Sequence, residues 1–105
     1  MRSSYEWEQD IIDCLSNSSY ENPMPVKDIS EIIGMNESHP SCPRTRELIL
    51  KAMVDFDVAY GANNKGYYKI RNKHEMQRYM NLLLDKQIAI SKRIEIVYNA
   101  FNRAN

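Results

Sequence analysis

The sequence predicts an α+β fold that is mainly α-helical, and three observations support this. Apolar residues recur at helical spacing in three short segments before residue 57 and in one long segment after residue 72. Between them, two short β-prone runs flank residues 61–66, which favours a β-hairpin. The 105 residues, 43% hydrophobic and 27% charged, are enough for one small core. We therefore expect three helices, a two-stranded hairpin and a long C-terminal helix.

The first helix is expected over residues 3–16. Ser3 and Glu6 form the S-x-x-E pattern of a capping box, which satisfies unpaired N–H groups at a helix start. One face is apolar and is expected in the core, with Cys14 as a small core residue. The members of that face are Trp7, Ile11, Cys14 and Leu15.

A second short helix is expected over residues 27–33, after a loop over residues 17–25 that is rich in Ser, Asn and Pro. Val26 is expected to be extended at the entry to this helix. Gly34 is predicted to end the helix, because the position after a helix often needs a positive φ. The side chains predicted to point inward are Ile29, Ile32 and Ile33.

The third helix is expected over residues 43–56, because proline suits a first helical position, where its missing N–H would be unpaired. Its predicted buried face comprises Leu48, Ile49, Ala52, Met53 and Phe56. Two strands follow, over residues 58–60 and 67–70, with residues 61–66 as the turn. Neighbouring residues of a strand point to opposite faces, so one of Tyr67 and Tyr68 is expected in the core and the other can cover the third helix.

Residues 72–105 are predicted to form a second domain after a first domain over residues 1–71. Residues 73–103 contain no Gly or Pro, and at 1.5 Å per residue a helix of this length spans about 45 Å. Its apolar residues alternate at spacings of four and three, which is typical of a coiled coil, so we expect a homodimer. The expected dimer interface comprises Met76, Met80, Leu83, Gln87, Ile90, Ile94, Val97 and Phe101. The alternative is that the segment bends into two helices that fold back on the first domain.

The formal net charge is zero, but it is distributed unevenly. Residues 1–42 carry a net charge of −6 and residues 43–105 a net charge of +6. This asymmetry predicts one acidic and one basic face, although ordinary solvated charges would produce the same pattern.

Several classes of protein are excluded or disfavoured. No apolar run is long enough for a membrane span, and the N-terminus lacks the apolar core of a secretory signal. The two cysteines and two histidines are too dispersed for a zinc module or a disulfide scaffold. We therefore expect a cytoplasmic protein with no metal, no cofactor and no catalytic residues.

The predicted order of elements resembles that of the small winged helix-turn-helix proteins of phages and prophages of Firmicutes. The resemblance is carried by VKDISEIIGM (26–35), RELILKAM (46–53) and GANNKGYYKI (61–70), followed by EMQRYMNLLLDKQIAISKRI (75–94). It implies a DNA-binding regulator of phage transcription or replication, with the third helix in the major groove and the hairpin as a wing. The turn before the third helix is longer than the usual tight turn.

This resemblance implies that the exposed side of the third helix and the wing contact double-stranded DNA. Arginine suits guanine edges and phosphates, and lysine neutralises the backbone. These cations are expected to converge into one patch. The expected DNA-binding residues are Arg44, Thr45, Arg46, Lys51, Asn63, Asn64, Lys65 and Lys69.

Two other functions remain open. The same fold can bind a host protein without DNA, through the acidic first helix and the C-terminal apolar stripe. An enzyme is disfavoured, because the chain has no phosphate-binding glycine loop, nucleophile elbow or close pair of carboxylates on a loop.

Overall fold

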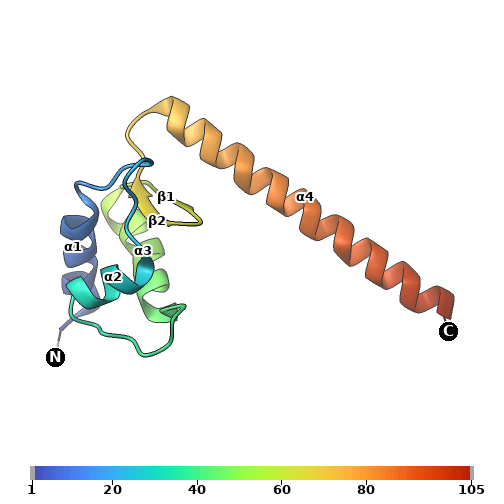
Figure 1. The fold of residues 1–105 in the computed structure, drawn as a ribbon, viewed down its shortest axis with the longest axis horizontal. Helices are drawn as coiled ribbons and strands as arrows, with labels where there is room; N and C mark the ends of the chain where they lie inside the picture. Colours follow the sequence, from blue (N-terminus) through green and yellow to red (C-terminus); the bar gives the residue numbers. More distant parts are fainter. Residues whose placement is uncertain (1, 105) are drawn as a thin grey trace. The chain divides into compact units, whose positions relative to one another are not determined.

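The computed structural model describes residues 2–104, which form four helices and a two-stranded antiparallel sheet (Figure 1). The predicted α+β, mainly helical class is therefore confirmed. The chain divides between Arg71 and Asn72 into two compact units. The elements are α1 (Ser4–Leu15), α2 (Val26–Ile32), α3 (Pro43–Phe56), β1 (Tyr60–Asn63), β2 (Gly66–Lys69) and α4 (Lys73–Ala104).

The helix α1 begins as the capping-box pattern predicts. The Ser3 hydroxyl accepts the Glu6 N–H at 3.2 Å, and it also lies 3.3 Å from the Glu6 carboxylate. Ile11 and Leu15 are fully buried on the expected face of the helix. This face packs against α3, and the two helices also meet through the rings of Tyr5 and Phe56, whose centroids are 5.1 Å apart.

Two expectations for α2 are wrong. Val26 is not extended, because it is the first residue of α2 and is buried. Ile32 does not point inward: 62% of its surface is exposed, because the buried stripe of this short helix runs through Val26, Ile29 and Ile33 at helical spacing. Gly34 follows with φ +86°, as the predicted helix end requires.

The helices of the N-terminal unit enclose one core (Figure 1). The helix α3 begins at Pro43 as predicted and contributes Ile49 and Ala52, both fully buried. Its other predicted core residues are partly buried. The buried residues that pack into this core cluster are Ile11, Leu15, Ile29, Ile33, Ile49, Ala52 and Tyr60.

The hairpin is longer and its turn tighter than expected. Strand β1 pairs with β2 from Tyr60–Lys69 to Asn63–Gly66, so only Asn64 and Lys65 remain in the turn. The predicted six-residue turn is wrong because three of its residues already pair within β1 and a fourth within β2. Tyr68 is buried and Tyr67 is half-buried, so the predicted division between the two tyrosines is confirmed.

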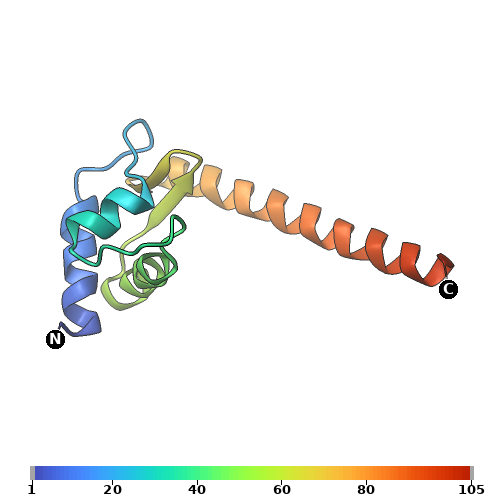
Figure 2. The same cartoon turned by 60° about the horizontal axis from the view of Figure 1, so that its bottom comes forward.

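The loop between α1 and α2 is joined to the edge of this hairpin, beside which it rises in Figure 2. Met24 and Tyr67 exchange two backbone hydrogen bonds, of 2.7 and 2.8 Å. Gly66 fits here because a Cβ at its position would lie 2.3 Å from the Met24 carbonyl oxygen, and its φ is +148°. The Arg71 guanidinium closes the unit by donating to the carbonyl oxygens of Ser16 and Ser18.

The second unit is the single helix α4. Asn72 caps it by accepting the Glu75 N–H at 2.9 Å, and the helix runs uninterrupted to Ala104. The predicted long helix is confirmed, and the alternative of two shorter helices is wrong. None of its described side chains is buried. Within residues 2–104, none of the helices combines the length and the hydropathy that a membrane span requires.

Candidate nucleic-acid interface

The start of α3 is capped from outside the helix. Cys42, which precedes the first turn, has φ 46° and makes no side-chain cap hydrogen bond. The Glu37 carboxylate takes this role, because Oε1 accepts the Arg44 N–H at 2.9 Å and Oε2 accepts the Thr45 N–H at 2.8 Å. The positive end of a helix dipole favours an anion at this place. A carboxylate therefore occupies the backbone N–H groups that a phosphate would otherwise bind.

Thr45 belongs to this cap and not to the surface. Its side chain is fully buried, and its hydroxyl donates a hydrogen bond to Glu37. Burial acts to raise the pKa of Glu37, but the hydrogen bonds from Thr45 and Arg44 outweigh it and leave the pKa below its ordinary value. The expectation that Thr45 contacts DNA is wrong, because its side chain is buried and its hydroxyl is bonded to Glu37.

A groove of about 260 Å³ lies between the start of α2, the start of α3 and the hairpin. Its lining includes three cations, Lys27, Arg46 and Lys65, and no acidic side chain is among the described residues that line it. We call it the cationic groove. Lys27 was not expected here, because it belongs to the acidic part of the sequence, and only the fold brings it beside the hairpin. The uncharged residues of the lining are Pro25, Val26, Pro40, Ala62, Asn63, Asn64, Gly66 and Tyr67.

Arg46 is held in place within this groove. Its Nε donates to the Ser41 carbonyl oxygen at 2.6 Å, and one terminal nitrogen donates to the Tyr67 hydroxyl at 3.0 Å. The guanidinium also lies 5.7 Å from the centroid of the Tyr67 ring, within the range of a cation–π contact. These contacts fix the direction of Arg46, and the groove-facing charge is therefore present before any ligand binds.

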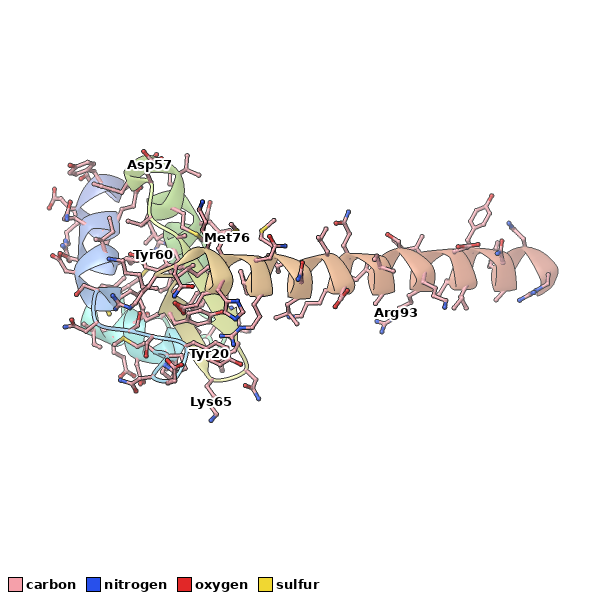
Figure 3. The ribbon with its side chains drawn as sticks, turned by 90° about the horizontal axis from the view of Figure 1, so that it is seen from above. Tyr20, Asp57, Tyr60, Lys65, Met76 and Arg93 are labelled. Carbon is pink, nitrogen blue, oxygen red and sulfur yellow. The ribbon has the colours of Figure 1, made fainter. Side chains whose placement is uncertain are left out.

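The residues of the hairpin tip have two roles: one stabilises the turn, and two are exposed to solvent. Asn63 shapes the turn, since its Oδ1 accepts the N–H groups of Lys65 and Gly66 at 2.8 and 3.2 Å. Asn64 and Lys65 are exposed, and Lys65 projects from the tip (Figure 3). Lys69, at the other end of β2, is half-buried and is not among the residues that line the cationic groove.

The other two predicted cations lie elsewhere. Arg44 and Lys51 line a hollow of about 290 Å³ at the start of α1, together with Arg2, Ser4 and Glu47. Lys51 Nζ donates to the Ser4 hydroxyl at 3.2 Å. The expected single patch is therefore wrong. Arg44 and Arg46 are two residues apart, and at 3.6 residues per turn they point to nearly opposite edges of the helix.

Between these two edges, the exposed face of α3 carries Glu47, Leu50 and Val54. Leu50 and Val54 are 62% and 77% exposed. Both lie outside the predicted apolar face, so their surface position could have been read from the sequence by their spacing from Ile49 and Ala52. The centre of this face is thus apolar and acidic, with cations on both sides.

One buried carboxyl group lies away from the surface, between α1 and α3. Glu8 is 1% exposed, and its Oε2 accepts the Ser4 hydroxyl at 2.9 Å. Its other oxygen is buried without a hydrogen-bond donor. Burial, and then the neighbouring Asp55 carboxyl, raise the pKa of Glu8. A proton held on Glu8 would join the two carboxyl groups.

The metal-ligating and thiol side chains can be placed in the described part of the chain. No group of three His, Cys, Asp or Glu side chains there is arranged to hold a metal. Burial raises the pKa of the Cys14 thiol, which disfavours the reactive thiolate. Comparison with known protein families, curated proteins and solved structures gives no match.

Proposed function

We propose that this chain is a homodimeric winged helix-turn-helix protein that binds duplex DNA and regulates transcription or replication of a phage or prophage. The order of elements supports this architecture: three helices are followed by a hairpin. Met24, between the first two helices, adds a single antiparallel β-bridge to the edge of that hairpin. The resemblance of the sequence to winged helix-turn-helix proteins supplies the phage context.

The cationic groove carries the proposal. Lys27, Arg46 and Lys65 come from three different elements and face one hollow without a neutralising carboxylate in its described lining. Such a groove attracts a polyanion, and each phosphate neutralised releases counterions. Arg46 is already oriented by Ser41 and Tyr67, so little rotamer entropy is lost when it meets a phosphate.

The remaining cations of α3 extend this contact. With α3 in the major groove, Arg46 on one edge and Arg44 and Lys51 on the other would each face a phosphate strand. The central residues would then face base edges: the methyl groups of Leu50 and Val54 suit thymine methyls. Dimerisation through α4 would present two such helices to two half-sites.

A second candidate is binding to a host protein. It is favoured by one observation, the apolar surface of Leu50 and Val54 beside Glu47 on the exposed face of α3. Exposed apolar side chains at the centre of a polar rim are typical of a protein interface. The Glu37 carboxylate at the start of α3 also repels phosphate there.

The proposal is tested by a gel-shift assay with random-sequence duplexes over a salt series. The double variant Arg46→Ala with Lys65→Ala removes two groove cations, so we expect affinity to fall at least tenfold at low salt. The slope of log affinity against log salt should flatten by about 1.8, because each lost phosphate contact contributes about 0.9. Lys92→Ala with Arg103→Ala is the matched control, since it removes two exposed cations from α4.

Each result separates the candidates. Arg44→Ala with Lys51→Ala tests the other edge of α3 and is expected to weaken binding less than the groove variant, because Glu47 lines the same hollow and offsets part of its positive charge. Unchanged binding by the groove variant would remove the cationic groove from the interface. Failure of the unsubstituted chain to bind any duplex at low salt would reject DNA binding and leave the host-protein candidate.

A further inference from the structure

The interface positions of α4 form one exposed stripe. Ile90, Ile94 and Val97 are 59%, 65% and 62% exposed, although they recur at the spacing that places them on a single side of the helix. A stripe of this length and hydrophobicity is covered in a stable protein. The homodimer proposed above supplies a second copy of α4 as the cover, but it leaves the relative direction of the two helices open.

Gln87 distinguishes the two directions. It is the one polar residue among the eight interface positions. In a parallel, in-register pair, Gln87 lies opposite the second copy's Gln87, and the two amides can hydrogen-bond to each other. In an antiparallel pair that keeps the whole stripe matched, Gln87 lies opposite the second copy's Ile90. Each amide would then be buried without a partner, which is costly.

Gln87 thus favours the parallel direction, and the charges beside the stripe favour it independently. Lys86 and Arg93 flank it on one side, and Ser91 and Tyr98 flank it on the other. The matched antiparallel pair brings Lys86 of each copy towards Arg93 of the other, so it contains two like-charge contacts. In the parallel pair Lys86 faces Ser91, and Arg93 faces the ring of Tyr98, the kind of contact that Arg46 makes with Tyr67.

We infer that two copies of α4 pair as a parallel, in-register coiled coil with Gln87 facing Gln87. This inference rests on the homodimer of the proposed function and adds its direction. Both N-terminal units then emerge from the same end of the coil, because each is joined to the start of its α4 at Asn72. Two DNA-binding units at one end can reach neighbouring half-sites, whereas an antiparallel pair separates them by the length of the helix.

Disulfide cross-linking of the full chain tests the direction. Leu83→Cys and Ile94→Cys each place a thiol on the stripe, eleven residues apart and thus about 16 Å from each other along one helix. In the matched antiparallel pair, Leu83 of one copy lies opposite Ile94 of the other, as Gln87 lies opposite Ile90. A disulfide needs Cα atoms within about 7 Å. In the parallel coil each variant cross-links to itself after mild oxidation, and a mixture of the two variants gives no mixed disulfide. The unsubstituted chain, whose Cys14 and Cys42 are half-buried and buried, is the control on a non-reducing gel.

The opposite pattern overturns the inference. If neither variant cross-links to itself and their mixture gives the mixed disulfide, the helices are antiparallel, and the homodimer itself stands. If light scattering finds the unsubstituted chain monomeric, or trimeric, at working concentration, the two-stranded coil is overturned while DNA binding is still decided by the gel shift.

A charge variant that avoids cysteine provides a second measurement. Lys86→Glu places its carboxylate opposite Ser91 in the parallel coil, so we expect the dimer dissociation constant to change less than about threefold. In the antiparallel coil the same substitution replaces a repulsion by an attraction to Arg93, and the dimer would tighten about tenfold or more. That tightening would overturn the inference.

Discussion

The two units of this chain differ in how far their apolar residues are buried. In the N-terminal unit, Ile11, Leu15, Ile29 and Ile49 are fully buried, and the core is closed by side chains of the same unit. In α4, the apolar positions Met76–Phe101 of the stripe are between 40% and 67% exposed. The first arrangement can stabilise a fold within one chain. The second gains stability only when another molecule covers it, since isolated helices in water are marginal.

Core truncation should separate the two units most clearly. Ile49→Ala is expected to lower the free energy of unfolding of the N-terminal unit by about 2–5 kcal/mol, because it leaves a cavity in a closed core. Ile90→Ala in α4 should leave that unfolding transition in place and weaken self-association instead. Thermal unfolding followed by near-UV circular dichroism, with light scattering on the same samples, measures both. Equal loss of near-UV signal in the two variants would contradict the comparison.

The next largest effect concerns the edge of the hairpin. Gly66→Ala is expected to destabilise the N-terminal unit by about 1–3 kcal/mol, because its Cβ would meet the Met24 carbonyl oxygen and its φ is +148°. Gly34→Ala is the matched control: its φ is +86°, but nothing lies within 4 Å of the added Cβ. It carries backbone strain without the clash and should cost less, about 1 kcal/mol. Chemical denaturation gives both values, and an equal cost for the two would mean that the close approach is unimportant.

Much of this fold follows from local sequence signals. Ser3, Pro43, Gly34 and the helix-forming run of α4 act within a few residues, so they fix where helices begin and end. The pairing of Met24 with Tyr67 was not predicted, because it depends on two residues that are distant in the sequence. Ile32 was misassigned because α2 begins at Val26: the buried stripe runs through Val26, Ile29 and Ile33, and Ile32 lies at its edge.

The candidate site was less predictable than the fold. Arg46 and Lys65 do meet in the cationic groove, but Lys27 joins them only through tertiary structure. Thr45 was misplaced because Glu37, which caps α3, lies eight residues before Thr45 in the sequence, farther away than the local capping patterns extend. Helical geometry alone could have separated Arg44 from Arg46.

The third prediction concerns the Glu37 cap, whose contribution to the stability of the N-terminal unit depends on pH. Glu37→Gln keeps the shape of the side chain and removes its charge, so it should lower the stability of the N-terminal unit by about 1–2 kcal/mol at pH 7. The pKa of Glu37 is lowered in the folded state, so its stabilisation is present above the ordinary value of 4.5 and is lost as the pH falls through the folded value. The difference between the two proteins should therefore shrink below pH 4.5. Thermal unfolding across pH 3–7 checks this, and a constant difference would rule out the charge as its source.

Glu8 should show the smallest effect and the opposite sign. Its pKa is raised by burial and by Asp55, so its contribution to stability is complete below 4.5 and is lost as the pH rises through the folded value. Glu8→Gln mimics the protonated form, since its amide can donate to Asp55, and is expected to raise the melting temperature at pH 7 by a few degrees. Glu31→Gln, at an exposed position of α2, is the control. A lower melting temperature for Glu8→Gln at pH 7 would show that Glu8 is ionised in the folded protein.

The position of Arg71 in the chain has a consequence for biosynthesis. The residues that close the N-terminal core, from Ser16 to the guanidinium of Arg71, have all been polymerised before the first turn of α4 is made. Every residue of the buried core therefore precedes the apolar stripe in the order of synthesis, and the N-terminal unit needs no residue of that stripe to complete its core.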